Sequence, residues 1–437
     1  MSLHQIAQPL SDRRLAAPLP RSPHRLEETG LDFAFVVELV TKVLFLRGQL
    51  RLPELSAHLK LPVGVLDPVL TLMRSERLCE MSRRGETEGA MLYTLTDIGR
   101  SRAQDFLARS QYSGPAPVSL NAYVEQVQKQ SILQMTVDRE RVRDVFKNVV
   151  IRETLLDQFG AGMASGRAVF IYGPAGSGKT YIAERLVGLA SGDIGVPYAI
   201  AVDNEVIQVF DAVVHHPVMQ EKAAGMLLDL GNRDDQRWVV CERPAIIAGA
   251  ELTLSMLDLQ FDPKARFYQA PPHVKANNGL FVVDDLGRQL VSPRDLMNRW
   301  IVPMDRRIDY LALHTGKKFL LPFDLILMFS SNLPPSELAD PAFLRRIGYK
   351  IFVGPLDETE YRRVFCDVCA GLGIPFSEEQ YHHLLERYHA RTGTPLLACF
   401  PRDILSQLKD FARFNGMEPA LTPELIDWAW NNYFTRD

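Results

Sequence analysis

The chain has 437 residues, of which 46% are hydrophobic and 23% charged, the composition of an ordinary soluble globular protein. Its 49 basic and 53 acidic residues give a formal net charge of −4, which excludes a protein whose whole surface is built to bind nucleic acid. Five cysteines, an odd and sparse set, exclude a disulfide framework. The sequence has neither a signal-peptide pattern nor an uninterrupted apolar run of about 18 residues, so we expect a cytoplasmic protein without membrane insertion.

Composition and periodicity divide the chain into five segments. Residues 1–32 are rich in Pro, Arg and Ser, show no periodicity and are expected to form a flexible arm. Residues 33–110 follow the order helix, short helix, short helix, hairpin, helix, which is typical of a winged helix-turn-helix domain. Residues 111–124 contain a Gly- and Pro-rich break and are predicted to be a linker. Residues 125–356 alternate strand-like runs with helical stretches, which predicts an α/β core, and residues 357–437 are helical almost throughout.

Three apolar runs in the α/β segment, RAVFIYG, GLFVVDD and DLILMFSSN, are each flanked by turn residues. Strands that form continuous apolar runs are typical of parallel sheets covered on both faces. The expected fold class is therefore α/β with a parallel sheet. Two hairpins are expected as well, one around Asp203 and Asn204 and one just before DLILMFSSN.

The strongest motif is GPAGSGKT at residues 173–180, which matches GxxxxGK followed by Ser or Thr, between a predicted strand and a predicted helix. Its glycines let the backbone wrap around phosphates, so that amide N–H groups and the helix N-terminus face the negative charge. In such a loop Lys179 reaches the β- and γ-phosphates and the Thr180 hydroxyl ligates Mg²⁺. ATP and Mg²⁺ are the predicted cofactors, and the predicted nucleotide-binding residues are Gly173, Pro174, Ala175, Gly176, Ser177, Gly178, Lys179, Thr180 and Tyr181.

A second motif, GLFVVDDLGR, places two acidic residues at the end of a predicted buried strand. Ligands of open α/β sheets bind at the carboxyl ends of the strands. Asp284 is therefore predicted to hold Mg²⁺ through water, and Asp285 to polarise the water that attacks the γ-phosphate.

The order of these motifs, followed by LILMFSSN ending at Asn332, PAFLRRIGYK and CFPRDIL, resembles that of an AAA+ ATPase over residues 125–437. The resemblance implies a P-loop NTPase core with Walker A and Walker B motifs, a C-terminal helical lid and assembly into a homo-oligomeric ring, most often a hexamer. It implies that Asn332 is the sensor that aligns the lytic water and that Arg402 is a second sensor on the γ-phosphate. It also implies that Arg345 or Arg346 is an arginine finger inserted into a neighbouring subunit's site, and the sequence leaves that choice open.

Two features refine this resemblance. The hairpin before the sensor strand is similar to the pre-sensor-1 hairpin of the branch that contains MoxR-type ATPases, chelatase motor subunits and enhancer-binding activators. The stretches LTDIGRSRA, ELTLSMLDL, KANNGLFVVDDLGRQLV and NRWIVPMDRR resemble bacterial ATPases described as having chaperone activity and an association with Flp pilus assembly. The chain departs from the family pattern at Asp285, where glutamate is typical, so a protein that binds ATP without turning it over is an open alternative.

These observations predict an ATP-hydrolysing ring that remodels a protein partner. In AAA+ rings, loops that face the central pore convert ATP-driven motion into force on that partner. Phe267, Tyr268 and the hairpin residue Tyr310 are candidates for such contacts, although aromatic residues near strand ends are more often packed than exposed.

An alternative from a different class is a DNA-binding regulator that uses the winged helix and responds to ATP. Residues 33–110 hold eleven Lys and Arg against nine Asp and Glu, with Arg74 and Arg77 near the expected recognition helix and Arg83 and Arg84 in the wing. A DNA footprint is normally more basic than this. The composition therefore favours a protein-docking role for this segment.

Overall fold

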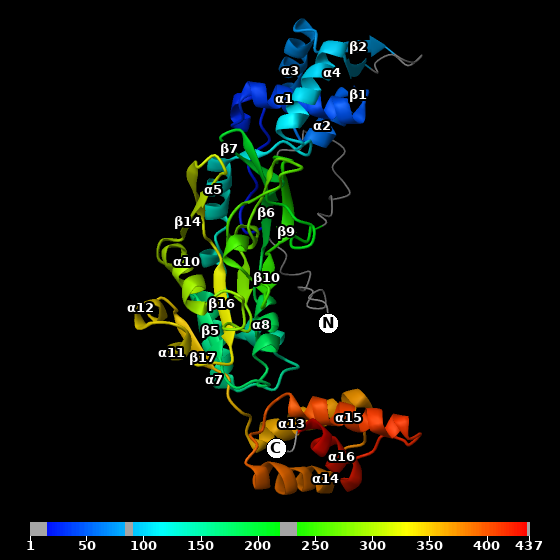
Figure 1. Cartoon of the computed structure of the whole chain (residues 1–437), viewed down its shortest axis with the longest axis vertical. Helices are drawn as coiled ribbons and strands as arrows, with labels where there is room; N and C mark the ends of the chain where they lie inside the picture. The colour runs from blue at the N-terminus through cyan, green and yellow to red at the C-terminus, as the bar shows by residue number, and fades with distance from the viewer. Residues whose placement is uncertain (1–14, 84–90, 219–233, 435–437) are drawn as a thin grey trace.

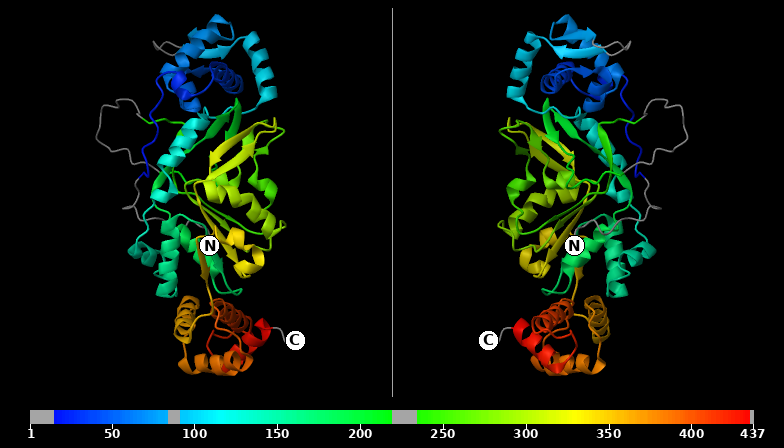
Figure 2. Two further views of the ribbon diagram at one scale, coloured as in Figure 1. Left: turned by 90° about the vertical axis from the view of Figure 1, so that its left-hand side faces the viewer. Right: turned by 90° about the vertical axis from the view of Figure 1, so that its right-hand side faces the viewer.

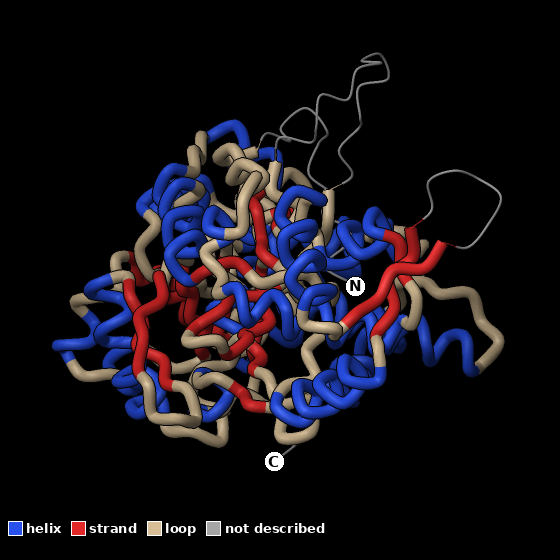
Figure 3. Tube along the Cα trace, turned by 90° about the horizontal axis from the view of Figure 1, so that it is seen from above, coloured by secondary structure: helices blue, strands red, loops and turns tan. Residues whose placement is uncertain are grey.

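The computed structural model describes residues 15–83, 91–218 and 234–434. The described part of the chain forms three successive tiers, with an N-terminal unit at one end, an α/β unit in the middle and a helical C-terminal unit at the other end (Figure 1). The two side views show the same three tiers (Figure 2). Seen along the long axis, many strands lie near the middle with helices around them, and others reach the right-hand side (Figure 3).

The N-terminal unit contains four helices and a three-stranded antiparallel sheet of order β1-β3-β2 among its described residues. Helix α1 is buried around much of its circumference, as its nearly continuous apolar sequence predicts, and packs on α3 and α4. The elements follow the order expected from the sequence, while residues 84–90, including Arg84, lie outside the described residues. The bounds are α1 Phe33–Arg47, β1 Leu50–Arg51, α2 Leu52–Leu59, α3 Val63–Ser75, β2 Cys79–Arg83, β3 Met91–Leu95 and α4 Asp97–Arg109.

The segment that precedes α1 is packed against the α/β unit from residue 15 onward. Leu15 forms a bridge with Asp193, and the amide of Gln126 donates a hydrogen bond of 3.2 Å to the Pro18 carbonyl. The Asp235 N–H donates to the Pro20 carbonyl at 2.8 Å. The prediction of a flexible arm is therefore wrong for residues 15–32. The prolines of this segment prevent a periodic pattern of apolar residues. Its backbone nevertheless forms hydrogen bonds with segments that are distant in the chain.

The predicted linker, residues 111–124, is packed against the rest of the protein. Tyr112 is buried, and β4 (Val118–Ser119) pairs with β7 before α5 (Leu120–Lys129) begins. Arg237 is buried against Asp235, and its guanidinium donates to the carbonyls of Thr29 at 3.1 Å and Pro117 at 3.0 Å. Residues 111–124, predicted to be a linker, are thus packed where they connect the two units, because this clamp ties both connections of the N-terminal unit to the α/β unit.

The central sheet consists of five parallel strands in the order β10-β13-β16-β5-β17. In chain order this is second, third, fourth, first and fifth, and the predicted α/β fold class with a parallel sheet is confirmed. The three predicted apolar runs form β5, β13 and β16. The bounds are β5 Val169–Tyr172, β10 Ala245–Ala248, β13 Leu280–Val283, β16 Ile326–Ser331 and β17 Tyr349–Phe352.

Alternate residues of these strands fill two separate cores. Ile171, Val282 and Met328 face one core together with α6 (Arg139–Val145), α7 (Glu153–Ser165) and α8 (Lys179–Val187). Phe170, Phe281 and Phe329 face the other core, where Trp300 and Phe343 pack from the opposite side. These two residues belong to α10 (Pro293–Arg306) and α12 (Pro341–Leu344), with α11 (Pro335–Leu338) beside them. Burial on both faces explains why the strands show no alternation of polar and apolar residues.

Two predicted hairpins are confirmed. Strands β7 (Ala199–Val202) and β8 (Glu205–Gln208) pair antiparallel through Asp203 and Asn204, which have φ angles of 55° and 64°. Positive φ at both central residues is what a type I′ turn requires. This hairpin joins a second sheet of order β11-β12-β8-β7-β4, with β11 Gln260–Phe261 and β12 Tyr268–Gln269. The second hairpin, β14 (Ile308–Ala312) with β15 (Lys318–Pro322), precedes β16.

The C-terminal unit is helical in its described residues, as the sequence predicts. Its core gathers aromatic side chains such as Tyr361, Phe365 and Trp430 around Leu408. Across the described residues of the whole chain, no helix combines the length and apolar character needed to cross a bilayer. The remaining bounds are β6 Asp193–Pro197, β9 Trp238–Glu242, α9 Pro272–Lys275, α13 Glu358–Leu372, α14 Glu378–Leu384, α15 Phe400–Phe414 and α16 Pro423–Tyr433.

Candidate functional site

The glycine-rich loop connects the end of β5 to the start of α8, the position that the motif predicts. Gly173, Gly176 and Gly178 have φ angles of 152°, 85° and 92°, a region that side-chain-bearing residues rarely occupy. A Cβ atom on Gly173 would also lie 2.0 Å from the Val353 carbonyl oxygen. The loop can therefore adopt this path only with glycine, and the path leads directly into the N-terminus of α8, where free backbone N–H groups favour an anion.

Lys179 is buried at the base of this loop and is surrounded by oxygen acceptors. Its Nζ donates to the carbonyls of Gly173 at 3.1 Å and Pro174 at 2.9 Å, and to Oδ1 of Asn332 at 2.7 Å. Burial lowers the pKa of Lys179 below its ordinary value, and the neighbouring Asp285 and Asp284 act in the opposite direction. The ammonium is thus held by three oxygen acceptors at the base of the loop.

Thr180 and Asp284 provide oxygen ligands of the kind that Mg²⁺ prefers. The Thr180 hydroxyl donates to Oδ2 of Asp284 at 2.8 Å, and Oδ1 of the same carboxylate is buried without a hydrogen-bond partner. Ser177 Oγ in the loop is also buried and unpartnered. Mg²⁺ is held by one or two protein oxygens together with substrate phosphates, and Thr180 and Asp284 offer such oxygens. The residues present fit Mg²⁺ with a nucleotide.

Asp285 and Asn332 meet at the end of the central strands. Asn332 Nδ2 donates to Asp285 Oδ1 at 3.2 Å, so Asn332 bridges Asp285 and Lys179. Asp285 has a φ of 49°, in the left-handed region that Asp and Asn tolerate better than longer side chains do. This backbone conformation gives a physical reason for aspartate at a position where the AAA+ resemblance leads one to expect glutamate.

A supporting residue was missed by the sequence analysis. Gln289 Nε2 donates to the Asp284 carbonyl at 2.8 Å and to the Gly249 carbonyl at 3.3 Å, and its Oε1 accepts from Gly287 N–H at 2.9 Å. Gln289 therefore holds the acidic turn against the loop after β10. No sequence pattern marks this role, because the partners come from two strands that are distant in the chain.

The C-terminal unit touches the glycine-rich loop directly. The Cys399 N–H donates to the Gly176 carbonyl at 3.1 Å, and a Cβ atom on Gly176 would lie 2.4 Å from Cys399 Sγ. Helix α15 begins at the next residue, so Arg402 lies in its first turn, where its side chain is exposed. Arg152 and Glu360 form a second link between the units, with a nitrogen–oxygen distance of 2.9 Å.

Arg345 and Arg346 lie away from the glycine-rich loop of their own chain. They follow α12 and line a groove together with Ala168 and Leu325, which precede β5 and β16. This is the edge of the sheet opposite to the strand ends that carry the loop. Arg346 Nε is ion-paired with Asp305 Oδ2 at 2.7 Å, whereas Arg345 is exposed and has no side-chain partner among the described residues. The structure thus distinguishes two arginines that the sequence left equivalent.

The aromatic candidates differ in exposure. Tyr181 is exposed, but its hydroxyl accepts a hydrogen bond of 2.7 Å from Arg185 on the surface of α8. Tyr268 is buried and hydrogen-bonded to His314, and Phe267 packs against Tyr112 with ring centroids 5.5 Å apart. Tyr310 is 49% exposed on the hairpin β14–β15. Of the three expected substrate contacts, Tyr310 is exposed, Phe267 is half-buried and Tyr268 is buried.

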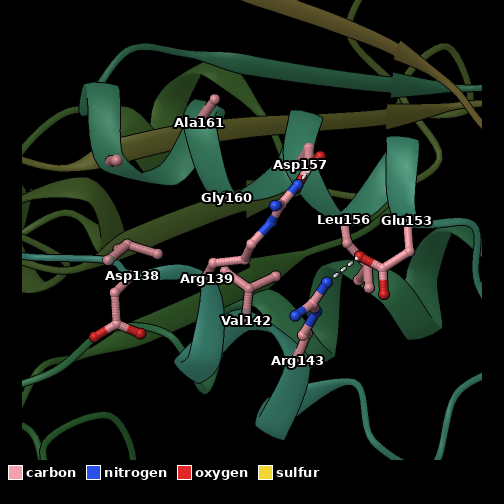
Figure 4. Close-up of a pocket in the computed structure, with 11 residues that line it drawn as sticks. Asp138, Arg139, Val142, Arg143, Glu153, Leu156, Asp157, Gly160 and Ala161 are labelled. Atoms are coloured by element: carbon pink, nitrogen blue, oxygen red, sulfur yellow. Dashed lines mark hydrogen bonds and ion pairs between the residues drawn. The ribbon is translucent and has the colours of Figure 1, made fainter.

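A separate surface pocket of about 180 Å³ lies between α6 and α7 (Figure 4). Its lining mixes apolar residues with charged ones, and Arg139 and Arg143 point toward Asp157 and Glu153 respectively. The Arg143–Glu153 distance is 2.9 Å, and Arg139 is ion-paired with Asp157. Because both guanidiniums are already neutralised, this pocket does not offer the free positive charge of a phosphate site.

Comparisons with known proteins find one family profile, described as Domain of unknown function (DUF8689), over residues 357–432. A search of curated protein sequences found no match. Among solved structures, NtrX from Brucella abortus is 11% identical with a TM-score of 0.40 and covers 70% of this chain and 57% of its own. A point mutant of RuvB from Thermotoga maritima is 8% identical with a TM-score of 0.36 and covers 69% of this chain and 72% of its own. Similarities this distant carry no inference about what the chain binds or does.

Proposed function

We propose that this protein binds ATP with Mg²⁺ in the glycine-rich loop and hydrolyses it. The observation that supports this most strongly is the continuous set of contacts at the end of the central strands. Thr180 contacts Asp284, and Lys179 contacts Asn332, which in turn contacts Asp285. Phosphoryl transfer to water requires a phosphate-binding loop, oxygen ligands for a metal ion and a carboxylate held in position to orient the water.

Each residue has a defined task in this proposal. The loop amides and Lys179 bind the phosphates, while Thr180 and Asp284 hold Mg²⁺, which supplies charge neutralisation on the phosphate oxygens. Asp285 accepts a hydrogen bond from the attacking water, and Asn332 keeps its carboxylate oriented. Arg402, carried by the helical unit that contacts Gly176, adds positive charge near the γ-phosphate when this unit closes as a lid.

The direct test is phosphate release at saturating Mg-ATP, comparing the wild-type chain with Asp285→Asn. We expect measurable turnover for the wild type and a loss of about 100-fold or more for the variant, because a positioned general base contributes roughly 10²–10⁴ in rate. ATP binding should be retained in Asp285→Asn. If the wild type binds ATP but releases no phosphate, the chain is a nucleotide-binding protein without turnover, and the hydrolytic part of the proposal is wrong.

We further propose that the chain works as a ring in which an arginine acts on the neighbouring subunit's nucleotide. The support is the position of Arg345 and Arg346 at the sheet edge opposite to their own loop. Hydrolysis per subunit should then rise with protein concentration. Mixing Lys179→Ala with the double variant Arg345→Ala, Arg346→Ala should restore part of the turnover that each lacks alone. A strict monomer with concentration-independent activity contradicts the ring.

The partner is proposed to be a protein, docked on the N-terminal winged helix. The exposed residues of α3 include Val63, Asp67 and Leu72, and Arg74 is the only arginine of this helix. The start of the helix is close to the preceding segment, because a Cβ atom on Gly64 would lie 3.3 Å from the His24 carbonyl oxygen. Such a surface suits an apolar protein contact better than a phosphate backbone. Remodelling of a partner in pilus or secretion assembly, as the resemblance suggests, is the setting that we propose.

The DNA-binding alternative has a simple test. Fluorescence anisotropy with random duplex DNA at low and moderate salt should show weak binding or none. Tight binding that falls steeply with salt, and that is lost on changing Arg74 and Arg77 to alanine, favours the regulator instead.

A further inference from the structure

The turn at residues 284–287 carries both acidic residues of the candidate site, and its backbone is unusual. Asp285 has a φ of 49° and Gly287 a φ of 109°. A left-handed conformation is disfavoured for any residue that has a Cβ atom, even though Asp tolerates it better than most. Left to itself, the turn would therefore relax toward a right-handed conformation at Asp285, and the carboxylate would move with the backbone.

The side chain of Gln289 bridges the two ends of this turn. Its Nε2 donates to the Asp284 carbonyl at 2.8 Å, and its Oε1 accepts from the Gly287 N–H at 2.9 Å. A primary amide carries donors on its nitrogen and acceptor lone pairs on its oxygen, so one glutamine can satisfy a carbonyl and an N–H at the same time. Asp285 lies between the two bridged groups, so this bridge spans the residue that has the unfavourable φ.

A third hydrogen bond connects the bridge to the central sheet. Gln289 Nε2 also donates to the Gly249 carbonyl at 3.3 Å. Gly249 directly follows β10 and Asp284 directly follows β13, and the ladder between these strands continues through the Asp284 N–H, which donates to the Ala248 carbonyl at 2.9 Å. The half-buried Gln289 therefore fixes the turn relative to two paired strand ends, which are rigid elements.

The two acidic residues depend on this bridge to different degrees. The Asp284 carboxylate accepts from the Thr180 hydroxyl at 2.8 Å, so it has an anchor of its own on α8. The Asp285 carboxylate is held by one longer hydrogen bond, from Asn332 Nδ2 at 3.2 Å, and otherwise follows its backbone. A displacement of about 1 Å from the reactive geometry can cost about 100-fold in rate. Loss of the bridge should therefore affect the task of Asp285 more than that of Asp284.

We propose that Gln289 is a positioning residue for hydrolysis, which keeps Asp285 in its left-handed conformation and so keeps its carboxylate aimed at the attacking water. The inference rests on the proposed ATPase function and deepens it. Gln289 hydrogen-bonds backbone groups only, so it acts through the turn and not on the nucleotide. Loss of Gln289 should accordingly slow the chemical step and leave nucleotide binding intact.

The test compares Gln289→Met with a control at the next residue. Methionine keeps the length of the side chain and removes the three hydrogen bonds. We expect Gln289→Met to lose about tenfold or more in kcat while its affinity for Mg-ATP stays within about twofold of the wild type. Leu290 is 89% exposed, and Leu290→Ala should hydrolyse ATP at the wild-type rate. Equal melting temperatures of the two variants show that Gln289→Met is folded. If it is not, Gln289→Asn, whose shorter amide cannot span the turn, should show the same division between kcat and affinity.

A double variant then separates action through Asp285 from a general loosening of the site. Because Gln289 acts through Asp285, the pair Asp285→Asn, Gln289→Met should be no slower than Asp285→Asn alone. Wild-type kcat in Gln289→Met, or a further loss of the same factor in the double variant, overturns the inference and leaves the ATPase proposal standing. Weakened Mg²⁺-dependent ATP binding in Gln289→Met also overturns it, because the bridge would then serve Asp284. A wild-type chain that binds ATP but releases no phosphate refutes the proposed hydrolysis, and the inference with it.

Discussion

Replacing Gly176 by alanine should detach the C-terminal unit from the glycine-rich loop. The new Cβ would lie 2.4 Å from Cys399 Sγ, whereas an ordinary contact begins at 3.4 Å, so either the Cys399 side chain changes its rotamer or the two units separate by about 1 Å. This separation weakens the hydrogen bond from Cys399 N–H to the Gly176 carbonyl, which is worth about 1 kcal/mol. The closed arrangement should therefore become up to about fivefold less populated.

Gly178 provides the matched control for this substitution. It has a φ of 92°, close to the 85° of Gly176, but a Cβ atom there meets nothing within 4 Å. Both variants therefore carry a similar backbone penalty of about 1–2 kcal/mol for a left-handed alanine, and only Gly176→Ala adds the steric contact. The measurement is hydrogen exchange at the Cys399 amide, which should be faster in Gly176→Ala and unchanged in Gly178→Ala.

A second substitution restores the contact. In the double variant Gly176→Ala, Cys399→Ala the sulfur is gone, and the next atom, Cβ of residue 399, lies at an ordinary 3.5 Å. Protection of the amide should return toward the wild-type level. Equal exchange at residue 399 in Gly176→Ala and Gly178→Ala would refute the reasoning, because the steric contact would then have no consequence for the closed arrangement.

Four further predictions follow from the contacts of the site and the core. Asp285→Glu should lower kcat, although the AAA+ resemblance leads one to expect glutamate here, since glutamate tolerates a φ of 49° poorly; turnover above the wild type contradicts this. Thr180→Ala should weaken Mg²⁺-dependent ATP binding and leave metal-free ATP binding nearly unchanged, which calorimetry with and without Mg²⁺ distinguishes. Arg237→Met should cost about 3–5 kcal/mol in urea unfolding, because it leaves the Asp235 carboxylate buried and unpaired; a cost below about 1 kcal/mol means that the clamp is not stabilising. Burial raises the pKa of Asp309, but hydrogen bonds from His273 and Arg299 outweigh burial and hold that pKa below its ordinary value, so its stabilising contribution is present above about pH 4 and is lost as the pH falls further. Asp309→Asn should therefore be less stable near neutrality and lose less stability on acidification, and parallel pH profiles of unfolding would contradict this.

The sequence predicts the site residues that depend on local pattern. The glycine-rich loop, the acid pair and the sheet strands are each defined by neighbouring residues, so a single sequence determines them. Lys179 and Thr180 are the first two residues of α8, and their partners Asn332 and Asp284 directly follow strands that the apolar runs predict. The roles expected for Asn332 and Arg402 come from the AAA+ resemblance, because the spacing of these residues alone does not predict them.

Long-range contacts account for what the sequence does not predict. The packing of residues 15–32 depends on backbone hydrogen bonds to segments that are distant in the chain, and the Arg237 clamp joins Thr29 to Pro117. No local sequence pattern predicts such pairings, because a proline-rich sequence is the same whether its carbonyl groups accept hydrogen bonds from the protein or from water. The difference between Arg345 and Arg346 likewise depends on Asp305, a residue on another helix.

The central claim is that the glycine-rich loop binds a magnesium nucleotide through Lys179. Isothermal titration calorimetry of the purified full chain with ATP in the presence of Mg²⁺ tests it most directly, with Lys179→Ala as the paired variant. The account predicts saturable binding by the wild type that is abolished or strongly weakened in Lys179→Ala. Binding of equal affinity in both proteins, or no heat of binding in the wild type, would contradict it.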